Sequence, residues 1–540
     1  MQQAIIPDAP VAATVSLTAS APVTLTADLA ATLTGIRRGI EKEGIRATAA
    51  ATLSAQPHPQ ALGAALTHPY ITTDFAEAQL ELITPAETDK KKTFAFLAAL
   101  HHTVAKQLPE GEVLWGASFP PRLPEESAIT IADYGQSNAG RLKKLYRQGL
   151  ANRYGRRMQT VSGIHYNFSL PEAFWQQLHQ QTGSELPLSA FISSRYFHLI
   201  RNVLRHGWVV PYLFGASPAL DSSYLAGREH PLQTLDDETF YLPWATSLRL
   251  SNLGYGSSEQ SQHAISYNNK EAYLNDLYRL LTLQSDGYAG IDAGEQVNTS
   301  VLQMENELYG AIRPKIVSED LRPLYAMCRK GVEYVELRSV DNNPYLPLGL
   351  DETQSHFLDV FLTYCALAPS PELLPEEMAI IQLRQELVAT EGRKPGLMLP
   401  TLDGAQPLVA MGESLLAAMQ PLAAALDSAF GIRAYGMPEA GYQSSLQRQQ
   451  DKFADSTLTP SAQLLADLQR HGVSYRTFVL QLAQQHHTFL QHIAVETDDV
   501  VQLQALAISS IAAQQQKEAQ DTLSFDDFLR EKNTLSSTCE

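Results

Sequence analysis

Apolar and polar residues alternate in five short segments of the chain, which predicts β-strands with one polar face. Side chains two positions apart in an extended chain point to the same side. The five segments are 40–45, 79–83, 163–169, 301–307 and 333–339. We therefore expect the polar members of each segment to share one face of a sheet: Glu41 and Glu43; Glu81; His165, Asn167 and Ser169; Gln303, Glu305 and Glu307; Glu336 and Arg338.

Two interpretations of this polar face are open. An antiparallel sheet with one face in water shows the same alternation without any function. A merely solvated face, however, would favour Lys, Thr and Ser over repeated Glu with single His and Arg residues. Carboxylates held close together repel one another, and a divalent cation with a preference for oxygen ligands removes that cost. The pattern therefore favours a sheet face that binds Mg²⁺.

Other stretches repeat apolar residues at helical spacing. Phe94, Leu97, His101 and Val104 predict one helix, in which His101 lies at the edge of the core, and the residues from Phe191 to Arg201 predict another. Further helices are expected over 413–430, 461–484 and 500–517. Strand and helix do not alternate regularly, so a mixed α+β fold is preferred to a doubly wound α/β fold.

The chain divides into three regions by composition. We expect an Ala/Thr-rich extension over 1–34 that packs on the main body, a middle region over 35–400 that carries any catalytic activity, and a mostly helical region over 401–540 that packs on the same body. A Pro-rich break at 369–375 precedes the last region. Chemistry is expected in the middle region, which is richest in aromatic residues, glycines and charges.

Composition and charge exclude several classes of protein. The 540 residues are 44% hydrophobic and 18% charged, with a formal net charge of −18, so the chain can bury a large core. An acidic surface does not suit bulk binding of nucleic acid, which needs clustered cations. No window approaches the roughly 20 consecutive apolar residues of a membrane span. We expect neither nucleic acid nor a membrane as a partner.

Targeting and cysteine signals are also weak. No Lys or Arg precedes Arg37, and the N-terminal stretch has no continuous apolar segment, so a secretion signal is not expected. Three cysteines without a Cys-x-x-Cys pair predict neither a disulfide framework nor a thiolate metal site, and Cys328 and Cys365 are expected to be buried. A cytoplasmic location is the simplest interpretation.

The common catalytic and nucleotide-binding motifs are missing from the sequence. We find no P-loop, no Gly-x-Gly-x-x-Gly fingerprint, no Gly-x-Ser-x-Gly elbow and no His-Glu-x-x-His. If ATP binds, metal ions and arginines must hold its phosphates. The arginines considered for this role are Arg147, Arg249 and Arg338.

Eight blocks of sequence in one order then become recognisable. They are GIRRGIEKE (35–43), ITTDFAE (71–77), YGRRMQTVSGIHYN (154–167), YLFGASP (212–218), ATSLRLSNLGY (245–255), ENELYGAIRP (305–314), EYVELRSVD (333–341) and EGRKPG (391–396). Together they resemble glutamate–cysteine ligase of the proteobacterial type over about two-thirds of the chain. Collinear blocks of this length are far more specific than one short motif.

This resemblance implies a glutamine-synthetase-like fold, in which a curved antiparallel sheet forms a cup surrounded by helices. It implies ATP- and Mg²⁺-dependent ligation of the γ-carboxylate of L-glutamate to the amine of L-cysteine through a γ-glutamyl phosphate, with Mn²⁺ as a substitute metal. That reaction gives γ-glutamylcysteine, ADP and phosphate, the first step of glutathione biosynthesis. A monomer and feedback inhibition by glutathione are further expectations.

The resemblance also implies roles for individual residues. Arg338 is expected on the ATP phosphates, Arg147 on the transferring phosphoryl group and Arg249 on a substrate carboxylate. Glu336 and His165 would contact the same groups, His165 either as a ligand or on phosphate. The implied metal ligands are Glu41, Glu43, Asp74, Glu81, His165 and Glu336. The implied pocket for the cysteine side chain consists of Phe75, Tyr146, Gln159, Tyr255 and Tyr309.

Simpler interpretations and rival functions stay open. Phe75 can be a core residue, Tyr309 a structural hydrogen-bond donor and Asp341 a turn residue; Glu305 and Glu307 cannot both be assigned. The main functional alternative is a γ-glutamyl ligase that uses a different amine acceptor, since pocket shape determines the acceptor. A phosphotransferase on a related fold and a non-enzymatic metal-binding protein are the other two classes.

Overall fold

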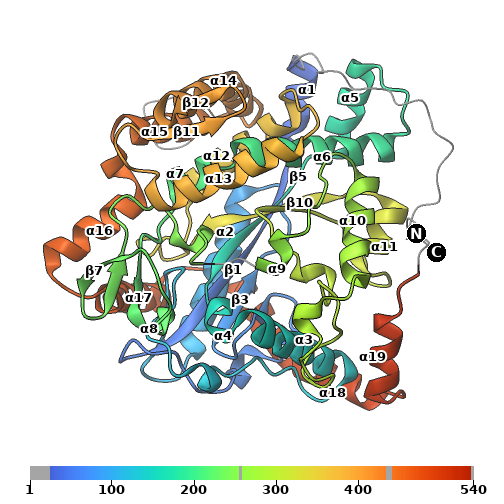
Figure 1. The fold of residues 1–540 in the computed structure, drawn as a ribbon, viewed down its shortest axis with the longest axis vertical. Helices are drawn as coiled ribbons and strands as arrows, with labels where there is room; N and C mark the ends of the chain where they lie inside the picture. Colours follow the sequence, from blue (N-terminus) through green and yellow to red (C-terminus); the bar gives the residue numbers. More distant parts are fainter. Residues whose placement is uncertain (1–24, 255–257, 433–440, 537–540) are drawn as a thin grey trace.

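An antiparallel sheet forms the centre of the protein (Figure 1). The structure is a computed structural model that describes residues 25–254, 258–432 and 441–536. The strands follow the order β2-β3-β1-β5-β10-β9, and β4 pairs with β1. Their bounds are β1 Arg37–Thr48, β2 Ile71–Thr73, β3 Gln79–Ile83, β4 Glu112–Leu114, β5 Gly163–Ser169, β9 Ile312–Lys315 and β10 Tyr334–Asp341.

Two small sheets and many helices surround this sheet. The first small sheet has the order β6-β8-β7 and the second pairs β11 with β12. Their bounds are β6 Ala219–Asp221, β7 Gln233–Asp236, β8 Thr239–Tyr241, β11 Met398–Thr401 and β12 Gly404–Pro407. The longer helices are α2 Lys90–Gln107, α3 Asn138–Tyr154, α5 Glu172–Thr182, α6 Leu188–His206, α10 Lys270–Thr282, α11 Pro323–Lys330, α12 Glu352–Leu367, α13 Pro375–Glu391, α14 Leu408–Ala429, α15 Tyr442–Ala454, α16 Pro460–His471, α17 Tyr475–His492, α18 Thr497–Gln520 and α19 Phe525–Asn533. The short helices are α1 Ala27–Thr32, α4 Arg156–Gln159, α7 Val209–Phe214, α8 Ser222–Leu225 and α9 Ser258–Ser261, with 3₁₀ turns η1 Leu33–Gly35, η2 Gln60–Leu62, η3 Glu126–Ala128, η4 Leu248–Leu250, η5 Asp286–Tyr288, η6 Glu305–Glu307 and η7 Ser456–Leu458.

The two faces of the central sheet have opposite chemistry. Ile40, Leu82, Ile164, Tyr166 and Leu337 lie on one face and belong to the main hydrophobic core. Helices α2, α6, α7 and α12 are among the elements that pack on this face and contribute to that core. The residues that alternate with these apolar side chains point to the other face. The period-2 pattern therefore turns the polar side chains away from the main core.

A buried ionic cluster ties the sheet to α12. Asp359 accepts a hydrogen bond from Tyr166 at 2.8 Å and pairs with Arg38 at 3.2 Å and with Lys90 at 2.9 Å. The Asp359 side chain is fully buried. Removing one member of such a cluster leaves an uncompensated buried charge and typically costs about 3–5 kcal/mol. The cluster therefore holds the strand that carries Glu41 at a fixed position against the helices.

Most of the expected elements are confirmed. Four of the five strand segments lie in β1, β3, β5 and β10, and the helices expected around 94–104, 191–201, 413–430 and 500–517 are α2, α6, α14 and α18. His101 is buried in α2. The protein is α+β, with an antiparallel sheet surrounded by helices, as the resemblance implied.

Two expectations about secondary structure are wrong. The segment 301–307 is not a strand but leads into the 3₁₀ turn η6, because Glu305 and Glu307 turn inward to pair with Arg322 and Arg153. The helix expected over 461–484 is two helices, α16 and α17. Gly472 ends α16 with φ of 60°, a left-handed conformation that glycine adopts without a steric penalty.

The described N-terminal and C-terminal segments pack on the body. Leu29 of α1 is fully buried in the main core, and α14 adds Leu416 and Met419 to it. Among the described residues, α14 alone has the length and hydropathy of a membrane-crossing helix. Its buried side chains, among them Leu415, Leu422 and Leu426, pack in the main core.

The cysteines differ in part from expectation. Cys365 is a free thiol and buried, as expected. Cys328 is only half-buried, so the expectation that it is buried is wrong, and it is disulfide-bonded although the sequence predicted no disulfide framework.

Candidate active site

Carboxylates from three strands converge on the polar face of the sheet. In the strand register, Glu41 lies opposite His165, Glu43 opposite Glu81, and Glu336 opposite Asn167. Directly opposite side chains on one face of an antiparallel pair lie close together. The register alone therefore gathers four of the expected acidic residues and the expected histidine.

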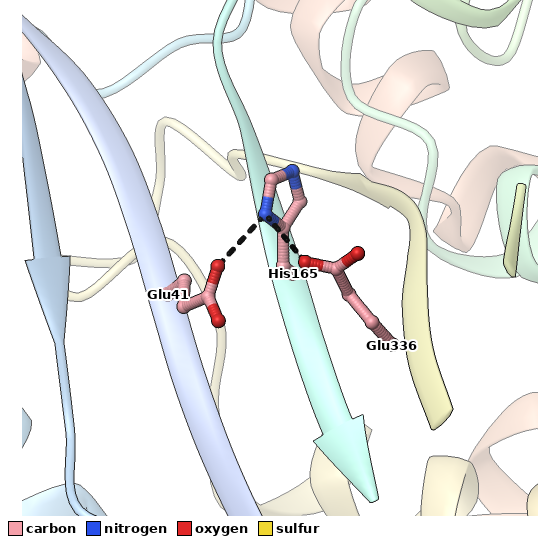
Figure 2. A group of neighbouring side chains, drawn as sticks. All are labelled: Glu41, His165 and Glu336. Carbon is pink, nitrogen blue, oxygen red and sulfur yellow. Dashed lines mark hydrogen bonds and ion pairs between the residues drawn. The ribbon is translucent and has the colours of Figure 1, made fainter. Parts of the chain in front are cut away.

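Glu41, His165 and Glu336 form the tightest group (Figure 2). Nδ1 of His165 lies 3.1 Å from Oε2 of Glu41 and 3.6 Å from Oε1 of Glu336. One ligand atom from each of the three residues lies within 4.8 Å of the others. Burial opposes ionisation of Glu41, but the hydrogen bond with His165 holds the pKa of Glu41 below its usual value.

Glu43 and Glu81 form a second acidic group beside the first. Burial raises the pKa of Glu81 well above its usual value, and the neighbouring Glu41, Asp74 and Glu43 raise it further. Burial and Asp74 likewise raise the pKa of Glu43, although the backbone N–H of Gly163 donates to its Oε2 at 2.7 Å. Without a cation, this arrangement of carboxylates cannot be fully ionised at low cost.

Positively charged side chains surround Glu336, at the β10 side of the acidic face. Burial alone would raise the pKa of Glu336, but Arg338 and Lys315 lower it far below the usual value. Nη1 of Arg338 lies 3.3 Å and Nζ of Lys315 3.4 Å from its carboxylate oxygens. Arg313 lies opposite Glu336 in the register, and its Nε is buried without a hydrogen-bond partner among the described residues. Glu336 of β10 is therefore surrounded by positively charged side chains of β10 and β9.

The donor set of this face fits a hard divalent cation. Carboxylate oxygens are the protein ligands that Mg²⁺ prefers. In addition, Oδ1 of Asn167 is buried beside Glu41 and accepts no hydrogen bond from the described residues, while its Nδ2 donates to Glu41 at 2.8 Å. An unsatisfied carbonyl oxygen next to several carboxylates is costly unless a cation or water fills the site. The residues present therefore fit Mg²⁺.

Arg147 lies at the Asp74 side of the acidic face. It extends from α3, its guanidinium lies 4.6 Å from the ring centroid of Tyr134, and its Nε donates to the backbone carbonyl of Asp74. Its charge also opposes the rise in the pKa of Glu81. The structure thus brings Arg147 to the expected face.

Arg249 is held by groups of the protein itself. Its Nε donates to Oδ1 of Asp341 at 2.7 Å, and its Nη2 donates to the carbonyl oxygen of Val340 at 2.8 Å. A Cβ at position 163 would lie 2.7 Å from its Nη1, so Gly163 permits the approach. Asp341 is the buried last residue of β10, which corrects the interpretation of Asp341 as a turn residue. The expected contact between Arg249 and a substrate carboxylate stays a prediction.

The expected aromatic pocket is assembled in part. Nε2 of Gln159 donates to the hydroxyl of Tyr309 at 3.1 Å, and Tyr146 is half-buried on α3 near Arg313. Phe75 is 1% exposed and packs in a second hydrophobic core, as the simpler interpretation of this residue expected, so its substrate role stays a prediction. Tyr255 lies outside the described residues.

Sequence reasoning missed three polar residues of this face. Arg313 and Lys315 alternate along β9, which is only four residues long and contains Pro314, so no periodic signal was visible. Asn167 was placed on the polar face without a role. The strand register was needed to show that these three side chains lie next to Glu336 and Glu41.

Fold and site together define an enzyme class: an α+β protein with an antiparallel sheet whose polar face holds clustered carboxylates beside arginines, suited to Mg²⁺ and a phosphorylated substrate. Comparison with known proteins narrows this class. A model of the glutamate–cysteine ligase family matches residues 24–388. The chain therefore belongs to the glutamate–cysteine ligase family and is a ligase.

Individual relatives agree with this assignment. The glutamate–cysteine ligase of Azotobacter vinelandii is 48% identical over 500 residues, which cover 91% of this chain and 93% of that protein. That of Alcanivorax borkumensis is 43% identical over 517 residues, covering 94% and 97%. The crystal structure of glutamate–cysteine ligase from Francisella tularensis in complex with AMP superposes with a TM-score of 0.85 at 32% identity, covering 92% of this chain and 97% of that chain.

Proposed function

We propose that this protein joins the γ-carboxylate of L-glutamate to the amine of L-cysteine at the polar face of its central sheet, with hydrolysis of ATP to ADP. The observation that carries the proposal is the convergence of Glu41, His165 and Glu336 beside Arg338 and Lys315. A carboxylate becomes an acylating agent only when one of its oxygens leaves as phosphate. Its attack on ATP requires that several negative charges be neutralised in one place.

The acidic residues would hold Mg²⁺, or Mn²⁺ in its place. Glu41, His165 and Glu336 form one group of ligands, and Glu43, Asp74 and Glu81 form its neighbour. When bound, the cation supplies positive charge that offsets the phosphate oxygens of ATP. The elevated pKa values of Glu43 and Glu81 support a site that is completed by a cation.

Arginine side chains would complete the charge balance around ATP. Arg338 lies beside Glu336 and would bind the phosphates bidentately. Arg147, which lies across the sheet at the Asp74 side, would bind the transferring phosphoryl group. Such preorganised cations contribute mainly by stabilising the charge that develops in the transition state.

The expected pocket for the cysteine side chain, which includes Tyr146, Gln159 and Tyr309, would bind the acceptor amino acid. Gln159 and Tyr309 hydrogen bond to each other, and both lie within reach of α3, which carries Tyr146 and Arg147. Aromatic walls suit a small polarisable thiol. The different amine acceptor that the sequence left open is not favoured by the match to the glutamate–cysteine ligase family and its relatives.

Three further properties belong to the proposal. Glutathione contains the γ-glutamylcysteine unit and would compete for the same site as a feedback inhibitor. The active form would be a monomer in the cytoplasm. The extension before residue 35 and the helices after residue 400 would stabilise the catalytic region, since Leu29 and Met419 enter the core behind the sheet.

Product analysis tests the proposed function. Purified protein is incubated with ATP and Mg²⁺, then with glutamate alone, cysteine alone or both, and ADP and products are followed by mass spectrometry. We expect sustained ADP release with both amino acids and the mass of γ-glutamylcysteine. Sustained turnover with another amine but not with cysteine would reject the acceptor, and a stable phosphorylated product without ligation would reject the ligase.

A further inference from the structure

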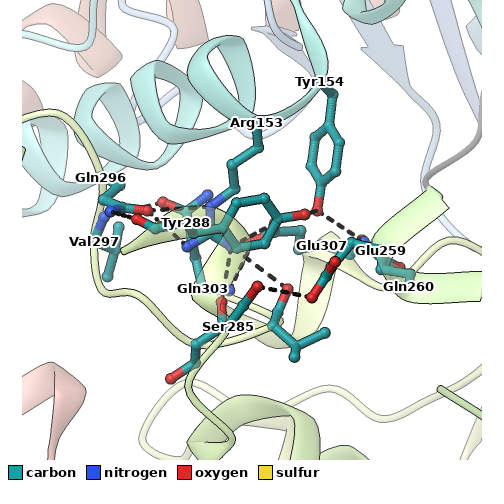
Figure 3. A network of polar contacts seen from close by, with 12 residues as sticks. Arg153, Tyr154, Glu259, Gln260, Ser285, Tyr288, Gln296, Val297, Gln303 and Glu307 are labelled. Atoms are coloured by element: carbon teal, nitrogen blue, oxygen red, sulfur yellow. Dashed lines mark hydrogen bonds and ion pairs between the residues drawn. The ribbon is translucent and has the colours of Figure 1, made fainter. Parts of the chain in front are cut away.

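Glu307 occupies the centre of a buried polar network (Figure 3). Through Gln260 this network reaches Tyr309 of the expected cysteine pocket. Oε1 of Glu307 accepts hydrogen bonds from Nη1 of Arg153 at 3.0 Å and from the hydroxyl of Tyr154 at 2.7 Å. Its Oε2 accepts from the backbone N–H of Gln303 at 2.7 Å. The side chains of Glu307 and Arg153 are both fully buried. A carboxylate at this depth is tolerated because every partner donates to it.

Gln260 connects this network to Tyr309. Its Nε2 donates to the hydroxyl of Tyr154 at 3.1 Å and to the backbone carbonyl of Glu307 at 2.9 Å. Its Oε1 accepts from the backbone N–H of Tyr309 at 3.0 Å. Gln260 is 8% exposed and lies in the short helix α9. One amide therefore fixes the backbone on both sides of Leu308.

Tyr309 is consequently held at three points. Its backbone N–H is bonded to Gln260, its hydroxyl accepts from Gln159, and its ring lies 5.6 Å from the ring of Tyr154 at an angle of 70°. Edge-to-face contacts at such distances are favourable. None of these partners except Gln159 was assigned to the pocket.

The same network fixes helix α3, which carries the other side of the pocket. Arg153, near the end of α3, donates to Oε1 of Gln296 and to the carbonyl oxygens of Asn298 and Ser300. Nε2 of Gln303 donates to the carbonyl oxygen of Tyr146 at 3.4 Å. The segment around residues 296–309 therefore sets the distance between α3 and Tyr309.

We infer that Glu307, Gln260 and Tyr154 are positioning residues that set the geometry of the acceptor pocket through Tyr309 and α3. This inference rests on the proposed function, in which Tyr309 contacts the acceptor. The three residues do not touch the reacting atoms. They act by holding Tyr309 against Gln159 in the arrangement that fits one small amine, so they determine acceptor affinity and selectivity.

The conservative change Tyr154→Phe tests the inference. It removes the hydroxyl that joins Glu307 to Gln260 but keeps the ring that packs on Tyr309. The lost hydroxyl is hydrogen-bonded to Glu307, Gln260 and Tyr288, and these bonds hold Tyr154 in the network. We expect the KM for cysteine to rise about 3- to 10-fold, while kcat and the KM for ATP and for glutamate change less than twofold. Gln260→Leu, which also frees the backbone of Tyr309, should give a larger rise in the same constant.

The matched control is Tyr345→Phe, which removes another tyrosine–carboxylate hydrogen bond, to Asp467 at 2.6 Å, outside the site. It should leave all three KM values unchanged even if it lowers the thermal midpoint as much as Tyr154→Phe does. An equal change in every kinetic constant for Tyr154→Phe and Gln260→Leu, or no change in the KM for cysteine, would overturn the inference.

Tyr309→Phe separates failure of this inference from failure of the proposed function. If Tyr309→Phe raises the KM for cysteine but Tyr154→Phe and Gln260→Leu do not, the acceptor pocket stands and the positioning role is wrong. If Tyr309→Phe also leaves the KM for cysteine unchanged, the hydroxyl of Tyr309 does not contribute to acceptor binding. The positioning inference and the proposed role of Tyr309 in the acceptor pocket then both fail. In the double variant Tyr154→Phe/Tyr309→Phe, less-than-additive effects are expected, because both changes act on one contact.

Discussion

Glu43 and Glu81 lie directly opposite each other across β1 and β3, and burial raises the pKa of both. Like-charged side chains at this spacing destabilise a sheet. Other buried polar clusters in the protein, such as Asp359 with Arg38 and Lys90, contain the opposite charge that they need. In the proposed function, a bound Mg²⁺ would offset the repulsion between Glu43 and Glu81.

Removing one of these two charges should stabilise the protein when no metal is present. The variant Glu81→Gln keeps the shape of the side chain and ends its repulsion with Glu43, Glu41 and Asp74. We expect the thermal midpoint in the presence of a chelator to rise, by an amount that corresponds to about 1 kcal/mol, while ligase turnover is lost.

The control for this prediction is the exposed Glu110→Gln, which should change neither quantity. Differential scanning calorimetry with and without Mg²⁺ gives the readout. A lower midpoint for Glu81→Gln without metal would mean that the carboxylate of Glu81 is stabilised by the protein itself, contrary to this account.

The pair Arg249–Asp341 should contribute strongly to stability. Asp341 accepts from Arg249, from the hydroxyls of Ser217 and Ser247 and from the backbone N–H of Ala216, all between 2.6 and 2.9 Å. We expect Asp341→Asn to lower the free energy of unfolding by about 3–5 kcal/mol. Asp527→Asn, at an exposed pair with Arg530, should leave the free energy of unfolding nearly unchanged. Urea denaturation distinguishes the two, and equal costs would contradict the structural role.

Acid should destabilise the protein in part through His101. Burial, together with the nearby Lys42, lowers the pKa of His101 to about 3, while its Nδ1 lies 2.8 Å from the carbonyl oxygen of Leu97. Below the ordinary histidine pKa the unfolded chain binds a proton that the folded chain does not. The free energy of unfolding therefore falls as the pH falls, by about 2 kcal/mol from this site between pH 6.5 and 5.

The variant His101→Gln should lose this share of the pH dependence, and the neighbouring His102→Gln, half-buried on the same helix, serves as the control. Urea denaturation at pH 6.5 and pH 5 measures the difference. If the two variants lose stability equally over this range, protonation of His101 does not contribute.

The sheet and its acidic face could be predicted from the sequence because strand alternation is a local signal. The pairs Glu41–His165 and Glu43–Glu81 confirm that residues two apart shared the expected face. Alternation failed at Glu305 and Glu307 because their pattern arises from buried ion pairs with Arg322 and Arg153. Those partners lie 17 and 154 positions away in the sequence, so no local pattern reveals them.

The sequence could not show which side chains pair with each other in the folded protein. Nothing in the sequence indicated that Asp341 pairs with Arg249, because the two are 92 positions apart and only folding brings them together. Lys315 and Arg313 have no periodic context on a strand of four residues. The residues to which the family resemblance gave a role were therefore expected, whereas Arg313, Lys315 and Asn167 were recognised only from the strand register and their contacts.

The nucleotide should depend on Arg338. This guanidinium contacts Glu336, and the variant Arg338→Met removes its charge from the acidic face. We expect the KM for ATP to rise at least 10-fold, the effect of about 1.4 kcal/mol or more of lost binding energy, with a smaller effect on the KM for cysteine. Steady-state kinetics with one substrate varied at a time provide the measurement. Arg470→Gln, at an exposed pair with Asp467, is the control and should behave as wild type.

The most direct test of the account is binding of Mg²⁺ to the protein itself, without substrates. Isothermal titration calorimetry compares wild type with the double variant Glu41→Gln/Glu336→Gln, which keeps the size of both side chains and removes two carboxylates of the group with His165. We predict that the affinity for Mg²⁺ falls at least 10-fold, an effect in the range known for altered metal sites, while circular dichroism shows an intact fold. An unchanged affinity in the double variant would contradict the claim that this face of the sheet holds the metal.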